Sequence, residues 1–238
     1  MQSDMTPDGL DFIKFRQSIL GFFDSRQAGD IYKYYYSSVS NHPTLYASVY
    51  ACLTYSLLGK LQELSNESRC EWLEYFDSFQ NGNDGLFYDP VVANDLLYDN
   101  SDWWGARHLA LHMITAYTDL GSKPKYPFYF LTKYLDIYDW LNGCDWSSAI
   151  GMTSDIDNKI MNIGCLLQYQ RDTWEDEKAR QSILDLQQYL LEKINPQRGC
   201  GDVMTFPIWN NGQEWYSLLI IYFLCFFTIK FQFNIQIK

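Results

Sequence analysis

Ten residues with side chains suited to chemistry gather at the expected starts of four apolar helices. In chain order they are His42, Asp102, Trp103, Trp104, Arg107, His108, Asp155, Asp157, Glu214 and Trp215. A carboxylic acid or an imidazole can donate or accept a proton, and indole rings line apolar or sugar-binding surfaces. We predict an acid–base site whose catalytic residues are Asp157, Asp155, Asp102 and His108. The other six residues are predicted to bind the substrate.

The three aspartates also fit a purely structural role. Ser154-Asp155 and Ser101-Asp102 each precede an apolar run. Ser and Asp side chains accept hydrogen bonds from the free N–H groups at a helix start, and a negative charge there suits the helix dipole. Helix capping is therefore the alternative to catalysis at these positions.

His108 and His112 are four residues apart, so both project from one face of a helix. This spacing suits two ligands of a metal ion, with Asp102 or Asp157 as a third. The pair has no Glu or Cys at a fixed offset, and ordinary hydrogen-bonded histidines are the alternative. We predict neither a metal nor a cofactor.

A fourfold internal repeat is expected to position these residues. Each copy opens with an aromatic residue followed by an aromatic or aliphatic one, and the openings are 53, 59 and 55 residues apart. The openings are Phe22-Phe23, Tyr75-Phe76, Tyr134-Leu135 and Tyr189-Leu190. Repeats of this length indicate that one supersecondary unit, here a helical hairpin, stacks on copies of itself.

Hydrophobic periodicity divides the chain into four hairpins within one domain. The units cover approximately residues 8–61, 70–121, 128–171 and 175–229, and residues 230–238 form a tail. The first helix of each unit is expected over 8–25, 71–79, 128–140 and 175–194, and the second over 45–61, 102–120, 154–171 and from about 211. The first helices carry a polar face, whereas the second are apolar nearly all round, so the second helices are expected inside. If these inner helices all run the same way, their N-terminal ends meet at one rim of a central hollow.

Composition excludes several classes of protein. The 238 residues carry a net charge of −11, which argues against a nucleic-acid partner. The longest apolar run, 218–229, is shorter than the roughly 20 residues of a membrane span, so we predict no integral membrane span. Six scattered cysteines without a CxxC pattern favour reduced thiols, and we predict a cytoplasmic location.

The repeat resembles that of the terpenoid cyclase and protein prenyltransferase superfamily, whose fold is an α/α-toroid. That family's repeat has an aromatic-aliphatic pair, then Gln, Gly and Trp, and the best match here is Tyr75-Phe76, Gln80, Gly85 and Phe87. The resemblance covers about residues 20–225. It implies an all-α toroid of about four hairpins, which leaves an open arc, a truncated copy, or a unit that closes by forming a homo-oligomer.

The same resemblance implies a chemistry. Class II terpene cyclases carry an Asp-x-Asp-Asp motif at the start of an inner helix, and this chain has Asp155-Ile156-Asp157-Asn158 at such a position. By this likeness Asp157 is the general acid that protonates an alkene or an epoxide, Asp155 and His108 tune it, and tryptophans wall the pocket. The substrate is then a small apolar isoprenoid.

Two other functions stay open. The α/α-toroid also carries polysaccharide lyases and glycoside hydrolases, in which Asp102 with Asp157 or Glu214 is the acid–base pair and Arg107 holds a uronate carboxylate of an oligosaccharide. The third alternative is a repeat scaffold without catalysis.

Overall fold

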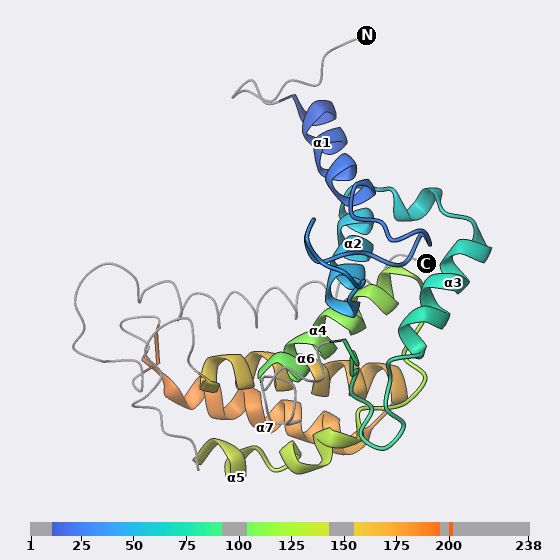
Figure 1. Ribbon diagram of the computed structural model, residues 1–238. Helices are drawn as coiled ribbons and strands as arrows, with labels where there is room; N and C mark the ends of the chain where they lie inside the picture. The colour runs from blue at the N-terminus through green and yellow to red at the C-terminus, as the bar shows by residue number, and fades with distance from the viewer. Residues whose placement is uncertain (1–10, 92–103, 143–154, 196–199, 202–238) are drawn as a thin grey trace. The chain divides into compact units, whose positions relative to one another are not determined.

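Helices make up most of the described chain, as the sequence predicts for an all-α protein. The computed structural model describes residues 11–91, 104–142, 155–195 and 200–201 (Figure 1). Contacts divide the chain into two compact units, Met1–Phe130 and Leu131–Lys238, which we describe separately as unit 1 and unit 2. The arrangement of the hairpins as a toroid stays a prediction.

Unit 1 contains two consecutive helix pairs. The first pair is α1 (Phe12–Asp24) with α2 (Leu45–Leu57), and the second is α3 (Asn66–Asp77) with α4 (Trp104–Asp119). A short 3-10 helix, η1 (Leu61–Glu63), lies between the pairs.

Polar side chains set the starts of these helices. Asp11 caps α1 by accepting a hydrogen bond from the backbone of Lys14. Thr44 and Ser65 cap α2 and α3 in the same way, each accepting from the amide three residues later. Such caps satisfy N–H groups that have no partner within the helix.

The turns after α1 and α3 have the same backbone pairing. Gln27 forms an antiparallel bridge with Tyr34, and Gln80 forms the equivalent bridge with Phe87, 53 residues later. Both bridges follow a helix that ends at an aspartate and a capping serine. The sequence repeat therefore corresponds to a repeated backbone turn.

The second helices also end alike. Gly59 and Gly121 both have a positive φ, and the residue after each donates a 2.8 Å hydrogen bond to the carbonyl of a tyrosine five residues earlier. These tyrosines, Tyr55 and Tyr117, donate to the aspartate that ends the first helix of their own pair, Asp24 at 3.3 Å and Asp77 at 2.6 Å. Equivalent residues therefore hold the two helices of each pair together.

Gln80 connects the second pair to the segment that follows α4. Its side-chain amide donates to the carbonyls of Gly85 and Tyr126 at 2.9 and 2.8 Å, and its Oε1 accepts from the Tyr126 amide at 2.9 Å. Gly85 has a φ of +80°, and a Cβ at this position would lie 2.0 Å from the carbonyl oxygen of Pro127. Only glycine fits such a close approach of two backbones.

The core of unit 1 is rich in aromatic side chains. Trp72 and Phe76 of α3 are fully buried; Trp72 packs with Tyr34 and Phe76 with Tyr117, which in turn contacts Phe87. Burial of large rings is the main apolar contribution to the stability of such a core.

Among the described cysteines, Cys52 of unit 1 and Cys165 of unit 2 are buried free thiols, whereas Cys70 is exposed.

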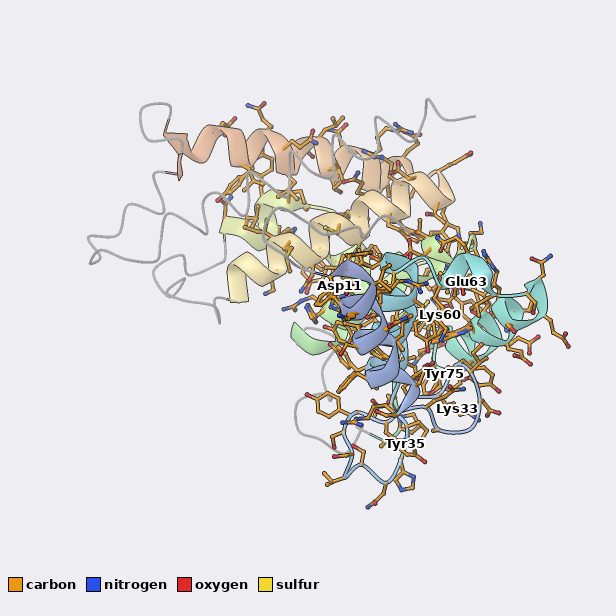
Figure 2. All side chains as sticks on the ribbon, turned by 90° about the horizontal axis from the view of Figure 1, so that it is seen from above. Asp11, Lys33, Tyr35, Lys60, Glu63 and Tyr75 are labelled. Atoms are coloured by element: carbon orange, nitrogen blue, oxygen red, sulfur yellow. The ribbon has the colours of Figure 1, made fainter. Side chains whose placement is uncertain are left out.

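Helix α1 is packed much less closely than α3. None of its residues is buried, and it exposes Phe12, Ile13, Phe15 and Phe22 while it extends away from α2 (Figure 1). The loop after it lies against α3, where Tyr32 contacts Tyr75 with ring centroids 5.1 Å apart. Lys33 lies on the same side of unit 1 as Tyr75 (Figure 2).

The helix expected over 128–140 is wrong as a single element. The chain forms a 3-10 helix, η2 (Tyr129–Tyr134), and then a short helix, α5 (Ile137–Asn142). Asp136 accepts a hydrogen bond from the amide of Asp139, which is a capping contact and starts a new helix. Apolar residues keep helical spacing across the break between η2 and α5, so their pattern did not reveal that the helix is interrupted.

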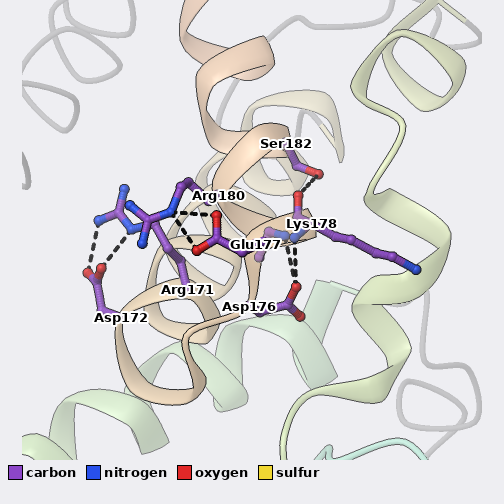
Figure 3. A network of polar contacts seen from close by, with 8 residues as sticks. Arg171, Asp172, Asp176, Glu177, Lys178, Arg180 and Ser182 are labelled. Carbon is purple, nitrogen blue, oxygen red and sulfur yellow. Dashed lines mark hydrogen bonds and ion pairs between the residues drawn. The ribbon is translucent and has the colours of Figure 1, made fainter.

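Helices α6 (Asp155–Trp174) and α7 (Glu177–Lys193) pack side by side in unit 2. They are followed by a minimal strand pair, β1 (Ile194–Asn195) and β2 (Cys200–Gly201). Figure 3 shows the turn between the helices, where Asp176 caps α7 and Arg171 forms a two-bonded ion pair with Asp172. None of the helices in the described ranges combines the length and apolar character needed to cross a bilayer.

Candidate functional site

Four polar aromatic side chains of unit 1 contact one another between α2 and α4. Tyr46 Oη lies 3.3 Å from His108 Nδ1, and Tyr50 Oη lies 3.0 Å from His112 Nε2. The Nε2 atoms of the two histidines are 3.2 Å apart. We call these four residues the Tyr–His cluster.

The helix register explains why the cluster forms. Tyr46 and Tyr50 are one helical turn apart on α2, and His108 and His112 are one turn apart on α4. Tyr46 pairs with His108, and Tyr50, one turn later, pairs with His112, one turn later. Helices α2 and α4 therefore run parallel. Both tyrosine–histidine pairs join residues 62 positions apart, which is also the separation of Gly59 from Gly121. The partners are thus equivalent positions when the two helices are aligned on these glycines.

The aromatic rings of the cluster are also in contact. The His108 and His112 rings meet edge to face with centroids 4.3 Å apart, and the Tyr50 and His112 rings are 4.9 Å apart. Tyr46 and Tyr50 lie nearly parallel, at 23°. Ring contacts of this kind restrict the rotamers, so the four polar atoms are held in place before any ligand arrives.

Hydrogen bonding assigns the proton of His108. The Tyr46 hydroxyl donates to the carbonyl of Gly105 at 3.2 Å. A tyrosine has one hydroxyl proton, so its oxygen accepts a hydrogen bond from Nδ1–H of His108. Neutral His108 then carries a lone pair on Nε2, directed at His112.

Burial keeps both imidazoles uncharged at neutral pH. It lowers the pKa of His108, and it lowers the pKa of His112 to about 4, with a smaller contribution from repulsion by His108. The pKa of Tyr50 is raised, mainly by desolvation and also by Tyr36, so its hydroxyl remains protonated. The cluster is a chain of neutral groups that can each donate or accept a proton.

The cluster is accessible from solvent. Tyr50 is 41% exposed, while Tyr46 and the two histidines are half-buried behind it. A ligand would therefore reach the Tyr50 hydroxyl first.

Only part of the predicted site lies in the described chain of unit 1. His108 belongs to the cluster, His42 is exposed just before α2, and Arg107 is fully buried beside His108 in the chain. A substrate carboxylate reaches Arg107 only if the atoms that cover it open, so its binding role stays a prediction. Trp104 opens α4.

The remaining predicted residues are not brought into this cluster. Asp155 and Asp157 occupy the first turn of α6 in unit 2, at the start of a second helix as the sequence predicts. Asp102, Trp103, Glu214 and Trp215 lie outside the described residues. The roles of these residues stay predictions. The expectation that all ten predicted site residues lie at one rim of a hollow also stays a prediction.

Sequence reasoning missed Tyr46 and Tyr50, and it gave His112 no catalytic role. The signal was present in the repeat. When Gly59 is aligned with Gly121, the two tyrosines fall on the same positions as the two histidines. Residues at equivalent positions of adjacent parallel helices face each other, so the alignment alone indicates the contacts.

Comparison of the chain with protein-family models, with curated proteins and with solved structures found no match. The function must therefore be argued from the site itself.

Proposed function

We propose that the protein is a carbohydrate-active enzyme that cleaves a uronate-containing polysaccharide by β-elimination. The observation that carries this proposal is the contact between the hydroxyl of Tyr50, a partly exposed residue, and Nε2 of His112, 3.0 Å away. Acid–base catalysis requires two proton-transfer groups within hydrogen-bond reach.

In this reaction Tyr50 touches the sugar. Its oxygen takes the proton from C5 of the uronate while its own proton moves to His112 Nε2, which requires the tautomer of His112 that carries its proton on Nδ1. The C4–O bond breaks, a C4=C5 double bond forms, and the proton returns through Tyr50 to the leaving oxygen. Protons balance within the tyrosine–histidine pair, so no other reactant is needed.

The character of the cluster favours a sugar over an isoprenoid. Its four side chains present hydroxyl and imidazole groups that pair with the hydroxyls of a sugar, and its tyrosine rings can stack on a sugar face. An isoprenoid has no groups to pair with them. We propose that the helix pairs continue as an α/α-toroid arc, in the cytoplasm, with an oligosaccharide as the ligand.

The test is a lyase assay on polyuronates such as alginate and pectate, monitored by the ultraviolet absorbance of the new double bond. We expect activity in the wild-type chain, a loss of at least about 100-fold in Tyr50→Phe and His112→Gln, and no change in Tyr138→Phe, which alters an exposed tyrosine of α5. The proposal is wrong if no polyuronate gives the absorbing product, or if Tyr50→Phe keeps full activity.

The isoprenoid cyclase is the second candidate. It is favoured by the position of Asp157 in the first turn of α6, where the resemblance to class II cyclases requires the general acid. Asp157→Asn should then abolish cyclisation of a linear isoprenoid. Asp172→Asn, which removes a carboxylate from the last turn of the same helix, should leave it intact.

A further inference from the structure

The two histidines of the Tyr–His cluster have the separation of two ligands on one metal ion. Their Nε2 atoms are 3.2 Å apart. Two imidazole nitrogens that bind one Zn²⁺ in a tetrahedral site, each at about 2.0–2.1 Å, are about 3.3 Å apart. The ring centroids are 4.3 Å apart, closer than the about 5 Å expected when both lone pairs point at one ion, so the rings must turn apart for the ion to fit between them.

The hydroxyl of Tyr50 lies beside one of the two nitrogen ligands. It lies 3.0 Å from His112 Nε2, close to the separation of adjacent ligand atoms in such a site. The described residues contain no group of three or more His, Cys, Asp or Glu side chains placed to hold a metal. The protein thus supplies two imidazoles and a phenol, and leaves positions open for water or a substrate.

A supporting hydrogen bond orients His108 for this role. Metal-binding histidines usually donate their other ring N–H to a neighbouring acceptor, which fixes the tautomer that binds the ion. His108 Nδ1 has such a partner in Tyr46 Oη, which is itself held by the carbonyl of Gly105. This arrangement directs the Nε2 lone pair of His108 toward His112.

We propose that His108 and His112 bind one divalent transition-metal ion through their Nε2 atoms, with the Tyr50 hydroxyl beside it. Imidazole ligands select zinc, copper or nickel over magnesium and calcium, which prefer oxygen. The ion uses the lone pair that accepts the proton of Tyr50 in the proposed lyase, so bound metal should inhibit that reaction.

This inference does not depend on the proposed function, because binding is measured without a substrate. The chain has three histidines, which provides a matched control in the exposed His42. Untagged protein is titrated with Zn²⁺ by calorimetry and with Cu²⁺ by electron paramagnetic resonance. We expect one ion per chain and a copper spectrum split by two imidazole nitrogens.

The variants decide between this site and adventitious binding. His108→Gln and His112→Gln should each weaken binding at least about tenfold, because one of two nitrogen ligands is lost, whereas His42→Gln should leave it unchanged. Unfolding curves without metal identify any variant that fails to fold, and a thermal shift by Zn²⁺ that is confined to the wild type and His42→Gln gives a second readout. The proposal is overturned if the wild type binds no metal, or if His112→Gln binds as tightly as the wild type. It is also overturned if His42→Gln loses binding. None of these results bears on whether metal-free protein is a lyase.

Discussion

The two helix pairs of unit 1 share one plan but differ in how firmly they are held. Both have a bridged turn after the first helix, a tyrosine that reaches back to the aspartate ending that helix, and a glycine that ends the second helix. In the second pair, α3 buries Trp72 and Phe76, and Gln80 connects the turn to Tyr126. In the first pair, α1 buries no residue.

This difference separates what makes a repeat fold from what anchors it to the next one. The bridge and the tyrosine–aspartate contact occur in both pairs, so they define the pair itself. The close backbone contact of Gly85 with Pro127 belongs to the second pair and joins it to the chain that follows α4. Substitutions at equivalent positions should therefore have unequal effects wherever they touch this connection.

The largest difference is expected between two turn glycines. Gly85→Ala should lower the free energy of unfolding by about 4 kcal/mol or more, because its Cβ would collide with the Pro127 carbonyl. Gly29→Ala has a similar positive φ but no atom within 4 Å, so it should cost only the backbone strain of about 1–2 kcal/mol. Urea unfolding of both variants measures the contrast, and equal losses would show that the close approach is not present in solution.

A smaller contrast is expected between the two turn glutamines. Gln80→Ala removes three hydrogen bonds to backbone groups and should cost about 3 kcal/mol. Gln27→Ala, at the equivalent and half-buried position of the first pair, should cost less than about 1 kcal/mol. Chemical denaturation again provides the measurement, and a Gln27→Ala loss that matches Gln80→Ala would contradict the distinction between the pairs.

The shared contact should give equal effects. Tyr55→Phe and Tyr117→Phe each remove a buried hydroxyl that donates to an aspartate, and each should cost about 2 kcal/mol. Tyr55→Phe also removes a 2.8 Å hydrogen bond to the hydroxyl of Tyr34, which offsets its longer contact with Asp24. If one variant is as stable as the wild type, that contact does not define the repeat. Tyr36→Phe, at a tyrosine that is 74% exposed, is the control and should be neutral.

The last contrast is a pH dependence expected in the second pair, where histidines replace tyrosines. The folded pKa of His112 is about 4 and its ordinary value is 6.5. Between these values the unfolded chain binds a proton that the folded chain does not, so unfolding becomes easier as the pH falls through this window. His112→Gln should show a shallower dependence when urea midpoints are measured across the window with a chelator present. Identical slopes for the two proteins would contradict the assigned pKa.

The sequence predicted the helices and the turn repeat well because both depend on local patterns. The helix start at Thr44 and the spacing from Gln27 to Gln80 are visible in the chain itself. The helix expected over 71–79 begins earlier, at Asn66, because the cap at Ser65 was missed. The break at Asp136 was missed because its capping role competes with an apolar pattern that continues past it. The Tyr–His cluster depends on which helix lies beside which. The 62-residue offset between the tyrosines and the histidines is present in the sequence, but it was not used to predict the contacts.

The most direct test of the Tyr–His cluster is a pH titration of the histidine ring nitrogens by NMR spectroscopy in metal-free protein. We predict that His108 holds its proton on Nδ1 and that His112 stays neutral until the pH approaches about 4, with Tyr50→Phe changing the His112 signals. Titration of both rings near the ordinary value of 6.5, with no response to Tyr50→Phe, would show that the two helices do not bring these side chains together.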